Sequence, residues 1–263
     1  MTASITLALT ADVRYVLRIA DTCLIQAQRL TEWCGHAPVL EEDIALANMS
    51  LDLIGQARML YRHAAAVAGD GATEDSLAYL RDAAAFRNYT LLELPHASND
   101  SERDYATTIV RNFLYSALML LRWDALQDSK DAQLAGIAGK SLKEVRYHFR
   151  HSRDWLLRLG DGTDESHVRT QAALDNLMPY TVEFWTPAAI ESVASPEGTG
   201  TSTASLQLRW DELVNDALKE AGLQRPATGA AVPHGKNGQH SKHLAPLLAD
   251  MQSLVRAHPG ALW

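Results

Sequence analysis

A long helical repeat between residues 131 and 159 limits the possible folds more than any other feature of this sequence. Apolar side chains recur there at intervals of four and seven residues: Leu134, Ala138, Val145, Phe149 and Leu156. That spacing places them on one stripe of an α-helix that faces a core. The segment therefore predicts a long internal helix.

The rest of the chain repeats this pattern. It predicts helices at about 12–34, 40–68, 74–93, 104–128, 131–159, 164–185, 203–221 and 240–257, and it contains no convincing strand. Two long antiparallel hairpins with accessory helices indicate an all-α, ferritin-like four-helix bundle. A chain of 263 residues can bury one sizeable core. We therefore expect a single domain over 1–263, with C-terminal accessory helices from about 186 onward.

Six polar side chains interrupt two of these helices in rows at i, i+4 and i+8. They are Asn48, Asp52 and Gln56 on one helix, and Lys140, Glu144 and His148 on the other. The run IALANMSLDLIGQA around the first row is apolar on nearly every side, so we expect neighbours to bury it all round. Inward carboxylates and imidazoles are typical of metal sites in four-helix bundles. The rows are therefore either such a site or its polar remainder.

The ligand set for a di-iron site is incomplete. Such bundles use one Glu from each of two helices and a Glu-x-x-His pair from each of the other two. Here the position three residues after Glu144 is Tyr147, and the position three after Asp52 is Gly55. We expect the first hairpin to turn near residue 37 and the second near residue 129 or 130. A turn near 37 places Asp52 level with residue 22, where Asp21 is the only nearby carboxylate.

The same folding places Glu144 level with about Tyr115, and His148 level with about Arg111. We interpret the rows as a vestigial metal site and expect a salt-bridged cluster, in which Lys140 or an Arg neutralises both carboxylates. We expect this cluster to hold no metal ion and no catalytic residue. Lys140→Ala should then cost a few kcal/mol of stability. A working metal site and an unrelated helical core are the alternatives.

Composition excludes other classes. The net charge of -8, the pI near 5.7 and the scattered Lys and Arg residues argue against a nucleic-acid partner. No window is apolar enough to span a membrane, and the first residues lack a secretory pattern. Two cysteines, Cys23 and Cys34, fit a reducing cytoplasm, and we expect Cys34 to be buried at a helix end. His240 and His243 have a ligand-like spacing, but their position is typical of a helix start.

Three segments carry a family resemblance: 32–58 (EWCGHAPVLEEDIALANMSLDLIGQAR), 142–163 (LKEVRYHFRHSRDWLLRLGDGT) and 238–252 (GQHSKHLAPLLADMQ). They resemble the PaaC family, the C subunits of bacterial multicomponent phenylacetyl-CoA 1,2-epoxidases, and the similarity runs nearly end to end. The resemblance implies a structural, noncatalytic subunit without its own cofactor.

The resemblance also implies partners. The chain would form a hetero-oligomer with a homologous catalytic A subunit that holds di-iron, joined by a small B subunit. A reductase with FAD and an iron–sulfur cluster would pass electrons from NADPH, so that O2 epoxidises the CoA-activated ring in phenylacetate catabolism. A homodimer of the chain alone is another possible assembly. A free-standing di-iron oxidase or iron-binding protein and an unrelated helical scaffold are the competing functions.

Overall fold

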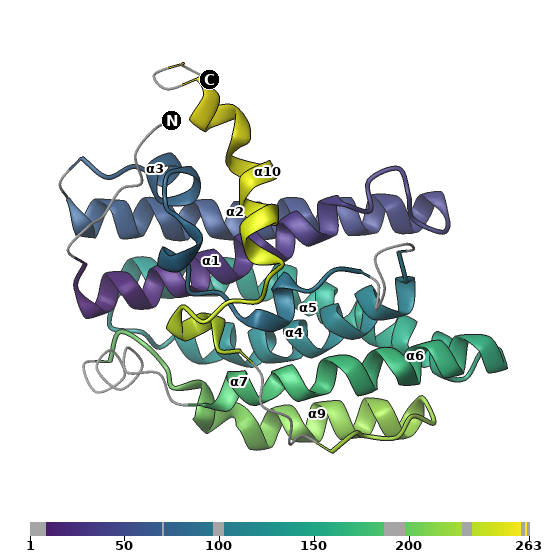
Figure 1. The fold of residues 1–263 in the computed structure, drawn as a ribbon. Coiled ribbons are helices and arrows are strands. Elements are labelled where there is room, and N and C mark those ends of the chain that lie inside the picture. The colour runs from purple at the N-terminus through teal and green to yellow at the C-terminus, as the bar shows by residue number, and fades with distance from the viewer. Residues whose placement is uncertain are drawn as a thin grey trace.

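The computed structural model describes residues 9–69, 71–96, 103–186, 198–227, 233–258 and 261. Within these ranges the chain forms helices and turns and no strand, which confirms the all-α expectation. Four long helices make the bundle (Figure 1): α1 (Ala11–Thr31), α2 (Leu40–Ala68), α4 (Tyr105–Leu126) and α5 (Ala132–Gly160).

The four helices form two antiparallel hairpins. Helix α1 packs along α2, α4 packs along α5, and α2 also contacts α5, which closes the bundle (Figure 1). Three of the helices begin at a polar cap: Thr10 accepts the backbone N–H of Val13, Asp104 that of Ala106, and Asp131 that of Leu134. Helices α1 and α4 are buried around most of their circumference, whereas α2 and α5 expose an outer face.

Accessory elements cover two sides of the bundle. Helices α6 (Asp164–Leu177) and α9 (Gln207–Glu220) pack on α4, with the short α7 (Val182–Trp185) beside them (Figure 1). Helix α10 (Leu244–Ala257) packs on α3 (Glu74–Tyr79) at the opposite side. None of the helices in the described ranges is long and apolar enough to cross a membrane.

Four predicted helices are shorter or more broken than expected. The 74–93 segment contains α3 and two 3₁₀ turns, η1 (Ala83–Ala85) and η2 (Thr90–Glu93). The 164–185 segment narrows to a 3₁₀ turn at η3 (Met178–Thr181), where Pro179 cannot donate a backbone hydrogen bond. The last two helices begin later than predicted: α9 begins at Gln207 after η4 (Thr203–Leu206), and α10 begins at Leu244, a few residues after η5 (Gly235–Asn237). The predicted accessory boundary near 186 adjoins residues 187–197, which lie outside the described residues.

The register of the first hairpin differs from the expectation. Ser50 Oγ donates to Ala27 O at 3.1 Å, and Tyr61 Oη donates to Asp21 Oδ1 at 2.6 Å. Residue 52 is thus level with about residue 27 instead of 22. The cause lies in the connection, where Trp33 N donates to Leu30 O and other turns carry the chain onward past the end of α1 before it reverses.

The outer face of α2 also departs from the expectation. Leu40, Ile44 and Leu51 share one side of the helix and are 72%, 52% and 64% exposed. The prediction that this run is buried all round is therefore wrong for the isolated chain. Asn48 stands on the same outer face and is exposed.

Candidate functional site

Two polar pairs link α2 to α5 at the middle of the bundle. His148 Nε2 lies 3.0 Å from Asp52 Oδ2, and Gln56 Nε2 donates to Glu144 Oε2 at 3.0 Å. Gln56 and His148 are buried, while Asp52 and Glu144 are partly exposed. The two rows of polar side chains therefore do meet, since antiparallel helices bring positions four residues apart on one helix to successive levels of the other.

Hydrogen bonds extend from Gln56 into the interior. Cys23 Sγ donates to Gln56 Oε1 at 3.7 Å, and Tyr115 Oη donates to Cys23 Sγ at 3.7 Å. Burial raises the pKa of the Cys23 thiol to about 12 and also raises the pKa of Tyr115. Both groups therefore keep their protons, so that Tyr115, Cys23 and Gln56 form a chain of donors ending on Glu144.

Lys140 does not neutralise buried charge. Its side chain is 61% exposed, and its ammonium lies 3.9 Å from Glu144 Oε1. A pair of this kind on the surface contributes little to stability, so the expected cost of a few kcal/mol for Lys140→Ala is wrong. Asn48, on the outer face of α2, is also not part of the buried set.

Arg111 binds the segment just after η2 and does not contact the α2–α5 pairs. Its guanidinium donates to Leu94 O and lies 2.7 Å from His96 Nδ1, and burial close to Arg29 lowers its pKa. His96 in turn lies 2.6 Å from Thr108 Oγ1. Arg111 therefore holds residues 94–96, just after η2, and is not a counter-ion for the α2–α5 pairs.

Asp21, expected opposite Asp52, belongs to a different buried cluster. Arg81 donates to both of its carboxylate oxygens, Tyr61 donates at 2.6 Å, and the backbone N–H of Arg87 donates at 2.9 Å. The shifted register of the first hairpin explains the change of partner. Sequence reasoning missed Arg81, because the surrounding 74–93 segment was predicted to be one helix.

A small cavity lies between the hairpins, beside His148. Its volume is about 10 Å³, the size of roughly one water molecule. Gln26 and Asn112 face each other across its lining and are joined by a short hydrogen bond. Among the described residues, Gln26 Oε1 and Asn112 Nδ2 have no hydrogen-bond partner. This cavity is thus lined by apolar side chains together with two amides, and it is too small to hold a substrate.

These groups do not fit a di-iron centre. A bundle of that kind supplies four carboxylates and two imidazoles, whereas the interior here offers three amides (Gln26, Gln56 and Asn112), a protonated thiol and a phenol beside Asp52, Glu144 and His148. No three His, Cys, Asp or Glu side chains in the described ranges are placed to share a metal ion. The arrangement can form hydrogen bonds that hold α2 to α5.

Comparison with known proteins identifies the family of this chain. The sequence model of the phenylacetic acid catabolic protein family, PaaA/PaaC, matches residues 2–263. The chain belongs to this family. It is also 44% identical over 249 residues to the C subunit of the 1,2-phenylacetyl-CoA epoxidase of Escherichia coli (strain K12), covering 95% of this chain and 98% of that relative. Family membership confirms the resemblance noted from the three sequence segments and the ferritin-like fold class.

The structure also tests the expectations for Cys34, His240 and His243. Cys34, expected to be buried, is exposed. His243 precedes the first residue of α10, as its helix-start interpretation predicts. His240 instead contacts the buried carboxylate of Glu93 at 2.6 Å, a contact with no signal in the local sequence.

Proposed function

We propose that this chain is a noncatalytic structural subunit of a phenylacetyl-CoA epoxidase. It pairs with a catalytic A subunit and stabilises it while that subunit epoxidises the ring of phenylacetyl-CoA in phenylacetate catabolism. The observation that carries the proposal is the 44% identity to the C subunit of such an epoxidase over nearly the full length of both chains. Di-iron belongs to the A subunit, and NADPH, FAD and an iron–sulfur cluster belong to a reductase, with a small B subunit as a further partner.

The chemistry of the bundle interior supports a noncatalytic role. Two carboxylates, one imidazole, amides and a thiol of raised pKa would supply too little negative charge to stabilise two iron ions. The polar pairs between α2 and α5 lie on facing helices inside the bundle, where metal-binding bundles carry their ligands. We interpret Asp52, Gln56, Glu144 and His148 as the remnant of a metal site.

The outer face of α2 is the contact that we assign to the A subunit. Leu40, Ile44 and Leu51 form an exposed apolar row, and large exposed apolar groups on one helix face are typical of protein interfaces. Tyr147, 39% exposed on the neighbouring α5, adds an aromatic group of the type enriched in such interfaces.

Co-purification and iron analysis test the proposal together. The chain should co-elute with a tagged A subunit when both are expressed, and after anaerobic reconstitution with Fe²⁺ the iron should follow the A subunit. Iron bound stoichiometrically by the isolated chain, with iron-dependent O2 uptake, would favour a free-standing di-iron oxidase. Failure of the two chains to associate would refute the subunit proposal.

A further inference from the structure

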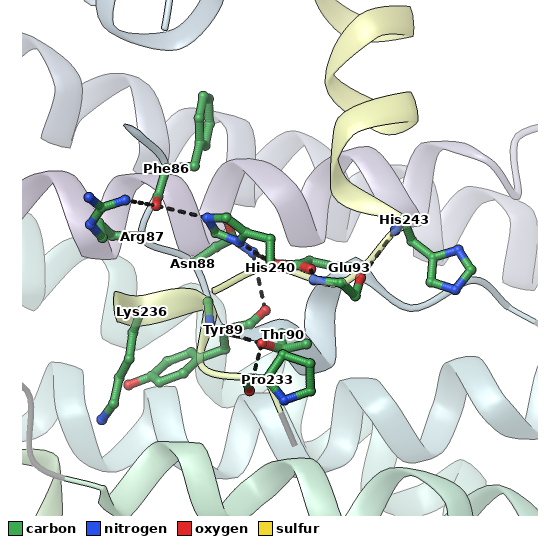
Figure 2. Close-up of polar contacts among 12 residues, drawn as sticks. Phe86, Arg87, Asn88, Tyr89, Thr90, Glu93, Pro233, Lys236, His240 and His243 are labelled. Carbon is green, nitrogen blue, oxygen red and sulfur yellow. Dashed lines mark hydrogen bonds and ion pairs between the residues drawn. The ribbon is translucent and has the colours of Figure 1, made fainter. Parts of the chain in front are cut away.

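Residues 233–243 lie across the loop 86–93, which connects the two halves of the bundle (Figure 2). Their contacts begin at Thr90. Its hydroxyl accepts the backbone N–H of Gly235 at 2.9 Å and donates to Pro233 O at 3.1 Å. The Thr90 hydroxyl thus hydrogen-bonds to both a backbone N–H and a backbone carbonyl of residues 233–243.

Glu183 on α7 holds the next residue. This carboxylate is fully buried, and its Oε1 accepts the backbone N–H of Lys236 at 2.8 Å. Its Oε2 accepts the backbone N–H of Thr90 at 2.7 Å, which ties the loop and the crossing segment to the same group. The Lys236 ammonium donates to Thr186 O, just beyond α7.

Glu93 holds the far end of the crossing segment. It is fully buried and accepts the backbone N–H of Ser241 at 2.7 Å and the amide of Asn88 at 2.9 Å. His240 Nδ1 lies 2.6 Å from Glu93 Oε1, and His240 Nε2 lies 3.0 Å from Phe86 O (Figure 2). A backbone carbonyl can only accept, so Nε2 donates there and Nδ1 faces the carboxylate.

The fit around Gly235 is close. A Cβ atom at this position would lie 2.5 Å from Asn88 O and about as close as a contact allows to Glu93 and Thr90, at 3.0 and 3.1 Å. Only glycine therefore lets the backbone approach its donors and acceptors at this point.

Beyond the crossing segment, α10 adds a separate patch of contacts. Leu244 and Leu248 are buried, and Gln252 donates to the backbone carbonyls of Ala78 and Arg81 at 3.2 and 3.0 Å. Residues 233–258 thus dock through one polar patch and one apolar stripe, both on elements that are distant in sequence.

We propose that Thr90, Glu93 and Glu183 form a peptide-binding site, whose ligand is the chain's own segment 233–258. The site recognises main-chain N–H groups at three positions, one imidazole and a glycine. Main-chain hydrogen bonds give such a site its affinity, and the contacts to the imidazole and the glycine give it its sequence specificity. On this proposal, residues 233–258 bind as one unit and can be exchanged for a peptide of the same sequence while the bundle stays folded.

The test uses the full chain with a specific protease site inserted between Arg225 and Pro233. After cleavage, residues 233–258 should co-elute with the rest of the chain. A fluorescent synthetic peptide of residues 233–258 should then replace the cleaved segment, as fluorescence anisotropy reports, while far-UV circular dichroism stays unchanged.

Variant peptides identify the contacts without affecting the bundle. His240→Ala should weaken peptide binding at least about tenfold, as expected for loss of a hydrogen bond to a charged group. Gly235→Ala should abolish it, because its Cβ meets backbone. The exposed neighbour Gln239→Ala is the matched control and should bind within about twofold of the native peptide.

Three results would overturn the proposal. The first is loss of the segment from the native chain as soon as it is cleaved. The second is exchange only under conditions that melt the bundle. The third is an equal loss of peptide affinity for the His240→Ala and Gln239→Ala peptides, which would mean that the contact between Glu93 and the imidazole does not contribute to binding.

Discussion

Replacing Arg81 with methionine removes the guanidinium that faces the carboxylate of Asp21, while keeping much of the apolar volume. Asp21 is fully buried, and the Arg81 side chain is 5% exposed. Removing one partner of a buried ion pair typically costs roughly 3–5 kcal/mol. Two donors remain on Asp21, from Tyr61 at 2.6 Å and from Arg87 N at 2.9 Å. We therefore expect a loss near the lower end, about 3 kcal/mol.

Urea unfolding followed by far-UV circular dichroism measures this loss. The double variant Asp21→Asn/Arg81→Met should be less destabilised than the sum of the two single variants, since neither partner is then left with an uncompensated charge. Lys140→Ala is the control, because it removes a cation that is 61% exposed and should cost less than about 0.5 kcal/mol. A cost below about 1 kcal/mol for Arg81→Met, or equal costs for the two cations, would refute the distinction between buried and surface pairs.

Three further measurements test the structure. Burial raises the pKa of Glu183 from 4.5 to about 7, so its contribution to stability is present below pH 4.5 and is lost as pH rises through 7. Relative to Glu183→Gln, the native chain should lose about 3 kcal/mol of unfolding free energy over that range in urea titrations, and parallel curves would contradict this. A thiol reagent should modify the exposed Cys34 rapidly in the native chain and Cys23 only after denaturation; rapid modification of both would disprove the buried assignment. Leu51→Asp should weaken co-purification with the A subunit about tenfold or more, whereas Leu208→Asp, equally polar and on the exposed side of α9, should not; equal effects would remove α2 from the interface.

Helical spacing was sufficient to predict the bundle and the meeting of the two polar rows. Residues at i, i+4 and i+8 share one side of a helix whatever surrounds it, so Gln56 and Glu144 could be assigned to facing rows before any contact was known. Their burial could not be predicted in the same way. Lys140 and Asn48 continue the rows, but both side chains lie on the outer faces of their helices and are exposed.

Two features could not be predicted from periodicity: the register of the first hairpin, and which surface buries the apolar faces of α2. The shift that moved Asp21 from Asp52 to Arg81 arises from hydrogen-bonded turns near Trp33, whose direction no helical pattern encodes. Likewise, apolar residues lie on nearly every side of α2, and this pattern is the same whether the helix is buried within its own chain or against a second chain. Leu51 is exposed in the part of the chain that the structure describes, which argues against the first case.

The contact between Glu93 and His240 joins residues that are 147 positions apart. Chains are synthesised at roughly 5–20 residues per second, so the imidazole follows its carboxylate by roughly 7–30 s. All four bundle helices are complete well before that time. The nascent chain therefore passes through a long interval in which the loop 86–93 is exposed to water and to other chains, and closure of this loop is among the last events in making the protein.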